Sequence, residues 1–233
     1  MPFKRMKAMM IVKAMILAAG KGERLAPLTN TVPKPLIKVD GETLIQRHLT
    51  ALVRAGIESV VINVSHLGDR IEQRLGNDGG LGIEISYSRE PGEPLETGGG
   101  IRRALPMLGH EPFLVVNADI WTDYDFGSCT IRGDAAAHIV VVPNPPHHAA
   151  GDFALNGFKI ERRDHNPYTY TGIGVYTPAF FTGMTQDRFP LAPLLIEHAR
   201  GGRLSGEIHA GAWFDIGTPE RLERLREMLG AER

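Results

Sequence analysis

Short apolar runs alternate with amphipathic segments along the first part of the chain. Four runs are bounded by glycine or polar residues, as buried strands usually are, at 14–17, 60–64, 113–117 and 138–142. A further segment, 83–87, alternates apolar with polar residues, which also favours a strand. Because most of these runs are apolar almost throughout, both faces of their sheet must be covered. The pattern predicts an α/β fold with a doubly wound, mostly parallel, Rossmann-like sheet.

Helices are predicted between these strands. The apolar residues from Leu44 to Val53 fall on one helical face, and the segment 67–75 has the same periodicity. A third helix is expected around 101–105, and we expect Pro106 to end it because proline removes a backbone donor. The order of strands and helices supports the α/β assignment.

The pattern changes after Pro143. Short alternating pieces near Phe153, Ile160 and 168–176 predict antiparallel strands, which we expect to form a small substrate-side lobe. A final helix is predicted over 218–229, with a threonine at its N-cap and leucines along one face. This helix should dock on the rest of the protein.

The start of the chain has two interpretations. Three basic residues precede an apolar stretch, as in a signal peptide. However, Lys13 interrupts that stretch, and cleavage after Ala19 would remove the first predicted strand. We therefore interpret residues 1–13 as an N-terminal extension and residues 14–233 as a single domain.

Composition and charge exclude several classes of protein. Lysine plus arginine number 26 and aspartate plus glutamate number 27, so the net charge of −1 gives no basic surface for nucleic acid. No apolar run approaches the ~18 residues of a membrane span. The single cysteine, Cys129, can form no internal disulfide and is interpreted as an inert thiol. These features predict a cytoplasmic protein with no membrane or nucleic-acid partner.

The segment after the first predicted strand is suited to binding phosphate. Gly20 and Gly22 let the backbone turn and bring amide N–H groups close to an anion, and Arg24 offers a planar cation. The dinucleotide pattern GxGxxG fails because Leu25 occupies the third glycine position. Lys34 lies between two prolines, and we expect an extended, stiff backbone to present its ammonium group.

Two aspartates are candidates for hard-cation ligands. Asp119 and Asp215 each follow a short apolar run, so parallel strand ends are expected to bring them together. The alternative for Asp119 alone is a helix or turn cap. Asp123 and Asp125 are interpreted as solvated or capping residues.

Four stretches together resemble the sugar-phosphate nucleotidyltransferase family. The segment LAAGKGERLAPLT, followed by PKPL, is similar to the signature loop of that family. LETGGG at 95–100 resembles its base- and sugar-recognition loop, and NAD at 117–119 and WFDIGT at 213–218 match in the same order. The resemblance extends from about residue 14 to the C-terminal helix. It implies a nucleotide-binding half at about 14–143, and a sugar-binding lobe with the C-terminal helix at about 144–233.

The resemblance implies an enzyme that transfers a nucleoside monophosphate from its triphosphate to a sugar 1-phosphate, with release of pyrophosphate. It places Mg²⁺ on Asp119 and Asp215. Arg24 and Lys34 are the expected catalytic residues, because they would hold the phosphates. The other expected nucleotide-binding residues are Ala19, Gly20, Gly22, Glu23, Thr97 and Gly98, and the expected sugar-binding residues are Asn117, Asp152 and Gly172. No general base is needed, since a phosphate monoester with a second pKa of about 6 is already an anionic nucleophile.

Within the family, the stretches LETGGG, NADIWTDYDF, FPLAPLL and WFDIGT are most similar to members of cell-wall recycling. That similarity implies UTP and N-acetylmuramic acid α-1-phosphate as substrates. Two alternatives stay open. One is transfer to another sugar 1-phosphate, of the mannose, glucose or heptose type. The other is an inactive sugar-nucleotide-binding regulator.

One departure from the family pattern concerns the substrate lobe. Many members carry a second lysine there, in a Glu-Lys-Pro segment that this sequence lacks. Lys159, Arg162 and Arg163 are the nearby substitutes that we consider. His147 and His148 are assigned a loop role, because adjacent histidines on a regular strand cannot face one metal ion.

Overall fold

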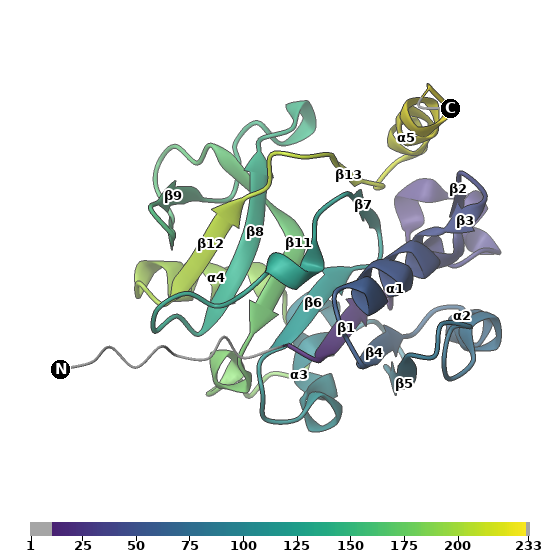
Figure 1. Cartoon of the computed structure of the whole chain (residues 1–233), viewed down its shortest axis with the longest axis horizontal. Helices are drawn as coiled ribbons and strands as arrows, with labels where there is room; N and C mark the ends of the chain where they lie inside the picture. Colours follow the sequence, from purple (N-terminus) through teal and green to yellow (C-terminus); the bar gives the residue numbers. More distant parts are fainter. Residues whose placement is uncertain (1–10, 232–233) are drawn as a thin grey trace.

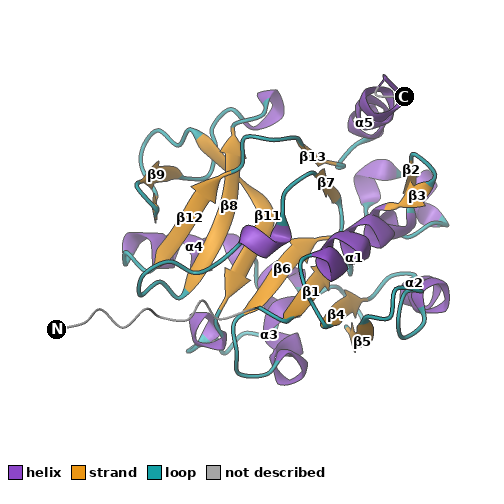
Figure 2. Ribbon diagram, in the orientation of Figure 1, coloured by secondary structure: helices purple, strands orange, loops and turns teal. Residues whose placement is uncertain are grey.

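A nine-stranded sheet forms the centre of the computed structural model, which describes residues 11–231 (Figures 1 and 2). Most of the predicted N-terminal extension lies outside the described residues. The strands of the sheet are β1 (Lys13–Leu17), β4 (Ser59–Val64), β5 (Glu84–Arg89), β6 (Phe113–Asn117), β8 (Ala137–Pro143), β9 (Ala154–Asn156), β10 (Lys159–Glu161), β11 (Tyr168–Tyr176) and β12 (Leu204–Ile208). Their spatial order is β5-β4-β1-β6-β11-β8-β12-β10-β9.

The sheet is mostly parallel, as the sequence predicts. β5, β4, β1 and β6 are parallel neighbours, and β8 is parallel to β12. β11 runs antiparallel to both β6 and β8, so that β8 and β12 point the same way as the first four strands. The sequence pattern did not predict this insertion of β11 into the middle of the sheet. The short β9–β10 hairpin lies at one edge of this sheet, so the predicted antiparallel pieces near Phe153, Ile160 and 168–176 extend the central sheet instead of forming a separate small lobe.

Helices cover both faces of the sheet (Figure 2). They are α1 (Leu44–Arg54), α2 (Gly68–Leu75), α3 (Glu96–Leu108), α4 (Leu191–Arg200) and α5 (Pro219–Ala231). Side chains alternate between the faces along β1: Ile16 packs in the cluster that includes residues of α1 and α2, whereas Met15 packs with residues of α3 and α4. This two-sided burial explains why the strands are apolar throughout.

Helix α3 differs from the expectation in both its start and its end. It begins at Glu96, so the three glycines of LETGGG lie in its first turns rather than in a loop. A Cβ on Gly98 would lie 2.4 Å from the Phe189 ring, and one on Gly99 would lie 2.2 Å from the Asp187 carbonyl oxygen. The glycines therefore let the segment before α4 cross the helix closely. Pro106 does not end the helix, because it lies in the last turn, where few backbone bonds are lost.

The C-terminal helix α5 docks beside the glycine-rich segment, as predicted. Leu222, Leu225 and Leu229 are buried in one cluster with Leu25 and Ile216. This packing fixes the start of α5 next to the turn that follows β1.

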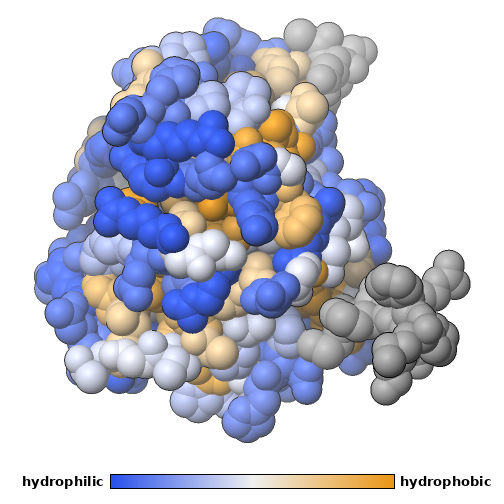
Figure 3. Space-filling model, turned by 90° about the vertical axis from the view of Figure 1, so that its left-hand side faces the viewer, coloured by the Kyte–Doolittle hydropathy of each residue, from blue (hydrophilic) through white to orange (hydrophobic). Residues whose placement is uncertain are grey.

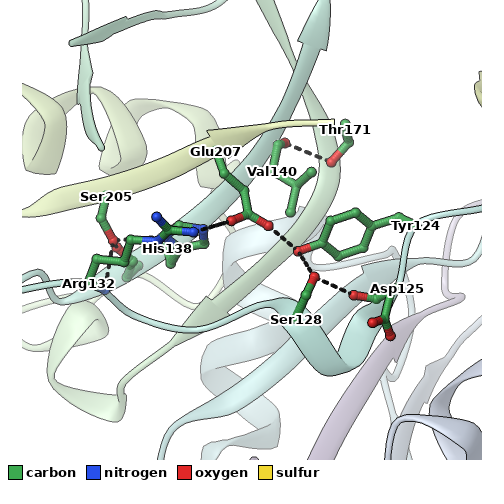
Figure 4. Close-up of polar contacts among 10 residues, drawn as sticks. Tyr124, Asp125, Ser128, Arg132, His138, Val140, Thr171, Ser205 and Glu207 are labelled. Atoms are coloured by element: carbon green, nitrogen blue, oxygen red, sulfur yellow. Dashed lines mark hydrogen bonds and ion pairs between the residues drawn. The ribbon is translucent and has the colours of Figure 1, made fainter. Parts of the chain in front are cut away.

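Two further small sheets lie outside the central sheet. One pairs β2 (Lys38–Val39) with β3 (Glu42–Thr43), and the other pairs β7 (Ile120–Thr122) with β13 (Trp213–Asp215). A polar network fastens the chain beyond β7 to the end of β12 (Figure 4). In that network Tyr124 Oη donates to Glu207 Oε1 at 2.6 Å, and Arg132 pairs with the other carboxylate oxygen at 2.7 Å. The segments that carry β7 and β13 are therefore held together at their far ends.

One face of the described surface is mainly polar. On the side where β9 lies, hydrophilic residues cover most of the face and hydrophobic ones form small patches between them (Figure 3). No described helix is long and apolar enough to cross a membrane.

Three buried histidines predict a pH-dependent stability. Burial lowers the pKa of His48 and of His138 from 6.5 to about 4, and it also lowers the pKa of His198. As the pH falls below 6.5, these histidines therefore become protonated in the unfolded chain but stay neutral in the folded protein. The free energy of unfolding should fall between pH 7 and pH 5, by as much as about 1.4 kcal/mol per pH unit for each histidine.

Urea unfolding at pH 7, 6 and 5 measures this slope. The His110→Gln variant, with the substitution at an exposed position, is the control, because it keeps all three buried histidines and should therefore show the same slope as the parent protein. Equal stability at pH 7 and pH 5 would contradict the assignment of neutral buried histidines.

Candidate active site

The glycine-rich segment turns at the carboxyl end of β1. Gly22 has a φ of +67°, and a Cβ there would lie 3.0 Å from Thr29 Cγ2 and 3.3 Å from Lys34 Cβ. Gly22 therefore allows both a left-handed turn and close packing of the PKPL segment. Gly20 differs, because nothing lies within 4 Å of its added Cβ. The space that a side chain at Gly20 would occupy is open, so a ligand can approach the backbone there.

Two neighbouring cavities open at this end of the sheet. The larger, of about 610 Å³, is lined by seven residues expected to bind nucleotide, namely Ala19, Gly20, Gly22, Glu23, Arg24, Lys34 and Thr97. The smaller, of about 410 Å³, is lined by Asn117 and Gly172 of the expected sugar-binding residues and by both candidate metal ligands. Three residues line both cavities: Arg24, Asn117 and Asp119. The cavities therefore meet at these side chains.

Two expected site residues lie behind the cavity walls. Gly98 packs against Phe189 and does not line either cavity. The Asp152 carboxylate is held by His148 at 3.0 Å and by the Tyr170 amide at 2.9 Å. It thus orients a histidine that lines the smaller cavity rather than lining the cavity itself.

Lys34 reaches the junction of the cavities from a turn of 3₁₀ helix, Lys34–Leu36. The expectation of an extended backbone at Lys34 is wrong. Pro35 is tolerated at the second helical position, where its missing N–H has no intrahelical partner to lose. The lysine is buried, and its Nζ lies 2.6 Å from Asp119 Oδ2. A buried ammonium group is thereby held at the point where the two cavities meet.

Antiparallel pairing of β7 with β13, not the ends of parallel strands, brings the two aspartates together. Asp215 lies opposite Ile120 in this pairing, and the Ile216 amide donates to the Asp119 carbonyl oxygen at 2.8 Å. The Asp215 carboxylate accepts a hydrogen bond from Arg221 and lies 3.1 Å from His147 Nε2. Each aspartate therefore pairs with a cationic side chain and lines the smaller cavity, and Asp119 lines the larger cavity as well.

The two carboxylates fit a hard divalent cation that is only partly liganded by protein. Among residues 11–231, no three histidine, cysteine, aspartate or glutamate side chains cluster as a metal site. That excludes a closed site with four protein ligands within this part of the chain. Mg²⁺ commonly takes one or two carboxylates and completes its coordination with waters and substrate phosphates. Asp119 and Asp215 could supply such a pair, because both line the smaller cavity.

A chain of buried hydrogen bonds supports the wall of the larger cavity, and the sequence analysis did not identify it. Asn63 accepts from the Ala18 amide at 2.7 Å and donates to Glu90 Oε1 at 2.7 Å. The other oxygen of Glu90 accepts from the Leu95 amide at 2.8 Å. A Cβ on Gly100 would lie 2.6 Å from this carboxylate, so a glycine is required there. These bonds tie the loop after β1 to the start of α3.

The smaller cavity is lined by two histidines to which the sequence suggested only a loop role and by an arginine that the sequence did not single out. His147 and His148 both line it, so their assignment to a loop role alone was incomplete. They face different carboxylates, Asp215 and Asp152, which a 3₁₀ turn allows. Arg221, from the first turn of α5, also lines this cavity. No motif signalled Arg221, because its position depends on where α5 docks.

The three basic residues considered as substitutes for a second lysine lie away from both cavities. Lys159 is exposed on β10, Arg162 donates to the Asp152 carbonyl oxygen, and Arg163 pairs with Glu161 at 2.5 Å. None of them lines either cavity. The expectation that one of them serves this site therefore gains no support from the structure.

Other residues behave as expected from the sequence. The Asp125 side chain caps a short 3₁₀ helix by accepting from the Gly127 amide at 3.0 Å. Asp123 lies 2.8 Å from His209 and outside the cavities. Burial raises the pKa of Cys129 to about 12, which agrees with an unreactive thiol.

Comparison with known proteins shows what this architecture is similar to. The family model described as nucleotidyl transferase matches residues 13–162. The chain is 45% identical over 229 residues to N-acetylmuramate alpha-1-phosphate uridylyltransferase of Neisseria meningitidis, covering 94% of this chain and 99% of the relative. It is 32% identical to mannose-1-phosphate guanyltransferase beta-B of Xenopus laevis, covering 90% of this chain and 62% of that one.

Solved structures agree on the fold. HddC from Yersinia pseudotuberculosis, complexed with GMP-PN, matches with a TM-score of 0.77 at 21% identity and covers 94% of this chain and 100% of that chain. UDP-glucose pyrophosphorylase complexed with UDP-glucose matches with a TM-score of 0.75 at 20% identity and covers 96% and 100% of the respective chains. The fold, the order of the motifs and the match over more than half of the chain lead to one conclusion: the chain belongs to the nucleotidyl transferase family.

Proposed function

We propose that the protein transfers UMP from UTP to N-acetylmuramic acid α-1-phosphate, in the presence of Mg²⁺, to give UDP-N-acetylmuramic acid and pyrophosphate. The observation that carries this proposal is the meeting of two cavities at Arg24, Asn117 and Asp119. Two anionic substrates must meet at the α-phosphorus for UMP to pass from one to the other, and a wall shared by both cavities supplies that meeting point. The identity of 45% to an enzyme named for this reaction supports the choice of substrates.

The proposed reaction is an in-line displacement at the α-phosphorus of UTP. An oxygen of the sugar phosphate forms the new bond to phosphorus, and the bond from the α-phosphorus to the bridging oxygen of pyrophosphate breaks. The attacking phosphate is already anionic near neutral pH, so no side chain has to remove a proton. Positioning and charge compensation are therefore the main tasks of the protein.

The side chains at the junction are suited to these tasks. Lys34 would hold the α-phosphate, and its burial strengthens its interaction with developing charge. Arg24 and the amides of Gly20 and Gly22 would hold the departing phosphates. Asp119 and Asp215 would hold Mg²⁺, which supplies charge neutralisation to the phosphate oxygens when it is bound. Asn117 and Gly172 would face the sugar.

A second candidate function is transfer of another nucleotide to another sugar 1-phosphate. The similarity to a mannose-1-phosphate guanyltransferase favours it as the alternative. Pyrophosphate release should be measured with UTP, GTP and dTTP, each with several sugar 1-phosphates. We expect UTP with N-acetylmuramic acid α-1-phosphate to give the highest kcat/KM. A higher value for GTP with mannose 1-phosphate would replace the proposal by this alternative, and no turnover with any pair would favour a binding protein.

Recognition of the lactyl group gives a sharper prediction. N-acetylglucosamine 1-phosphate lacks the lactyl ether and its carboxylate, and a site built for a charged group penalises its absence strongly. We therefore expect kcat/KM to fall by at least about 10-fold with N-acetylglucosamine 1-phosphate, since one charged hydrogen bond is worth about that much. Equal values for both sugars would contradict the assignment to N-acetylmuramic acid.

The two aspartates predict a metal-dependent defect. Asp119→Asn and Asp215→Asn each remove one anionic ligand, so most turnover should be lost and the Mg²⁺ concentration for half-maximal rate should rise. Pyrophosphate release over a Mg²⁺ titration measures this. Asp123→Asn, on the same segment but outside the cavities, is the matched control and should keep normal turnover. Near-normal kcat at ordinary Mg²⁺ in both variants would contradict the proposed ligands.

The two basic residues predict a defect in the transition state. Arg24→Ala and Lys34→Ala should each lower kcat/KM by about 10²–10³, as expected for loss of one donor aimed at developing charge. Lys34→Arg should rescue only in part, because a planar fork replaces a compact charge. Lys38→Ala, exposed on β2, is the control. If Lys34→Ala raised only KM, Lys34 would act in ground-state binding instead.

A further inference from the structure

Arg221 occupies an unusual place for an arginine at the start of a helix. Its amide bonds to Thr218 Oγ1, the N-cap of α5, at 3.4 Å, but its side chain extends away from α5 into the wall of the smaller cavity. There the guanidinium group donates to the Asp215 carboxylate and lies 3.0 Å from His147 Nε2. The side chain is 17% exposed. Arg221 is thus a largely buried cation at the edge of the reaction site.

The Arg221 and Arg24 guanidinium groups converge on Gly217. A Cβ on this glycine would lie 2.6 Å from Arg221 Nη2 and 3.1 Å from Arg24 Nη2. Two guanidinium groups therefore approach the same point from opposite ends of the chain. A larger residue at 217 would displace at least one of them.

This convergence leaves positive charge without a matching anion. Among the described residues, Arg24 makes no ion pair or hydrogen bond that would balance its charge. The nearby carboxylates are already paired with other cations, Asp215 with Arg221 and Asp119 with Lys34. Two nearby like charges repel each other unless an anion lies between them. The planar forks of arginine match the oxygens of a phosphate group in geometry and charge.

We infer that Arg221 binds the 1-phosphate of the sugar substrate, beside Arg24, which faces the phosphates of the nucleotide. This inference rests on the proposed function, since it places the sugar phosphate in the smaller cavity, which Arg221 lines, next to Gly217 of the larger cavity. Among the described residues, Arg24 and Arg221 are the two permanently cationic side chains that line that cavity, and no lysine lines it. Lys159, Arg162 and Arg163, the other candidates, lie elsewhere.

The geometry assigns Arg221 to the phosphate rather than to a carboxylate on the sugar ring. Arg24, which lines both cavities, must lie near the reacting phosphates, and Arg221 meets it at Gly217. Its contact with Asp215 places it beside the proposed metal ligands as well. A substituent on the sugar ring lies farther from the reacting phosphorus than the 1-phosphate does. Arg221 is therefore a substrate-binding residue at the reaction centre, contributed by the C-terminal helix.

The test compares Arg221→Gln and Arg221→Lys with Arg224→Gln, an exposed arginine on the same helix, as control. Thermal unfolding first establishes that each variant is folded. For Arg221→Gln we expect KM for the sugar 1-phosphate to rise by about 10–100-fold, the effect of losing a charged hydrogen bond. KM for UTP, and its equilibrium affinity measured by calorimetry, should stay within about twofold of the parent protein. Arg221→Lys should recover part of the loss, and it serves as the test variant if the glutamine variant does not fold.

Comparing KM for two sugar 1-phosphates shows whether Arg221 binds the phosphate or the lactyl carboxylate. If Arg221 binds the phosphate, KM should rise by the same factor for N-acetylmuramic acid 1-phosphate and for N-acetylglucosamine 1-phosphate. A rise for the first sugar alone would overturn the inference and assign Arg221 to the lactyl carboxylate. If the parent protein prefers a different sugar phosphate, that sugar is used, so failure of the proposed substrate leaves this test intact.

A Mg²⁺ titration separates binding from a structural role. Arg221 could act only by holding Asp215, and in that case the variants would need more Mg²⁺ but would show normal KM for the sugar at saturating Mg²⁺. That result, or an equal rise in KM for UTP and for the sugar phosphate, would overturn the inference.

Discussion

The antiparallel pairing of β7 with β13 is the constraint on which the site depends. It joins two carboxylates from distant parts of the chain, through the bond from the Ile216 amide to the Asp119 carbonyl oxygen. The network of Tyr124 and Glu207 fastens the same two segments farther from the site (Figure 4). Lys34 pairs with the Asp119 carboxylate and Arg221 pairs with the Asp215 carboxylate, so each negative charge is offset by a cation. The same cations line the cavities, Lys34 the larger and Arg221 the smaller.

Much of the fold could be predicted because its strands are buried on both faces. Continuous apolar runs such as 113–117 and the periodicity of α1 are local signals, and they gave the α/β sheet correctly. The position of β11 between β6 and β8 could not be predicted, since strand order depends on contacts between distant segments. The helical start of LETGGG was missed for a related reason. Its glycines fit the crossing segment before α4, which a local pattern does not reveal.

In the candidate site too, some residues could be predicted from local motifs and others could not. Residues within motifs, such as Gly22, Lys34 and Asp119, could be selected from the sequence and do line the cavities. Arg221 and the Asn63–Glu90 pair could not, because their positions come from docking of α5 and from hydrogen bonds between loops. The proposed division into a nucleotide half and a sugar lobe is also less strict than the sequence suggests. Gly217 lines the larger cavity and Asn117 lines the smaller one, so both halves contribute to both cavities.

We propose that UMP is transferred at the place where the two cavities meet. A crystal structure with Mg²⁺ and the product UDP-N-acetylmuramic acid tests it most directly. We expect uridine in the larger cavity, the sugar in the smaller cavity, and the diphosphate beside Arg24, Asn117 and Asp119. A product molecule held wholly within the larger cavity, with its diphosphate away from these three residues, would contradict the account.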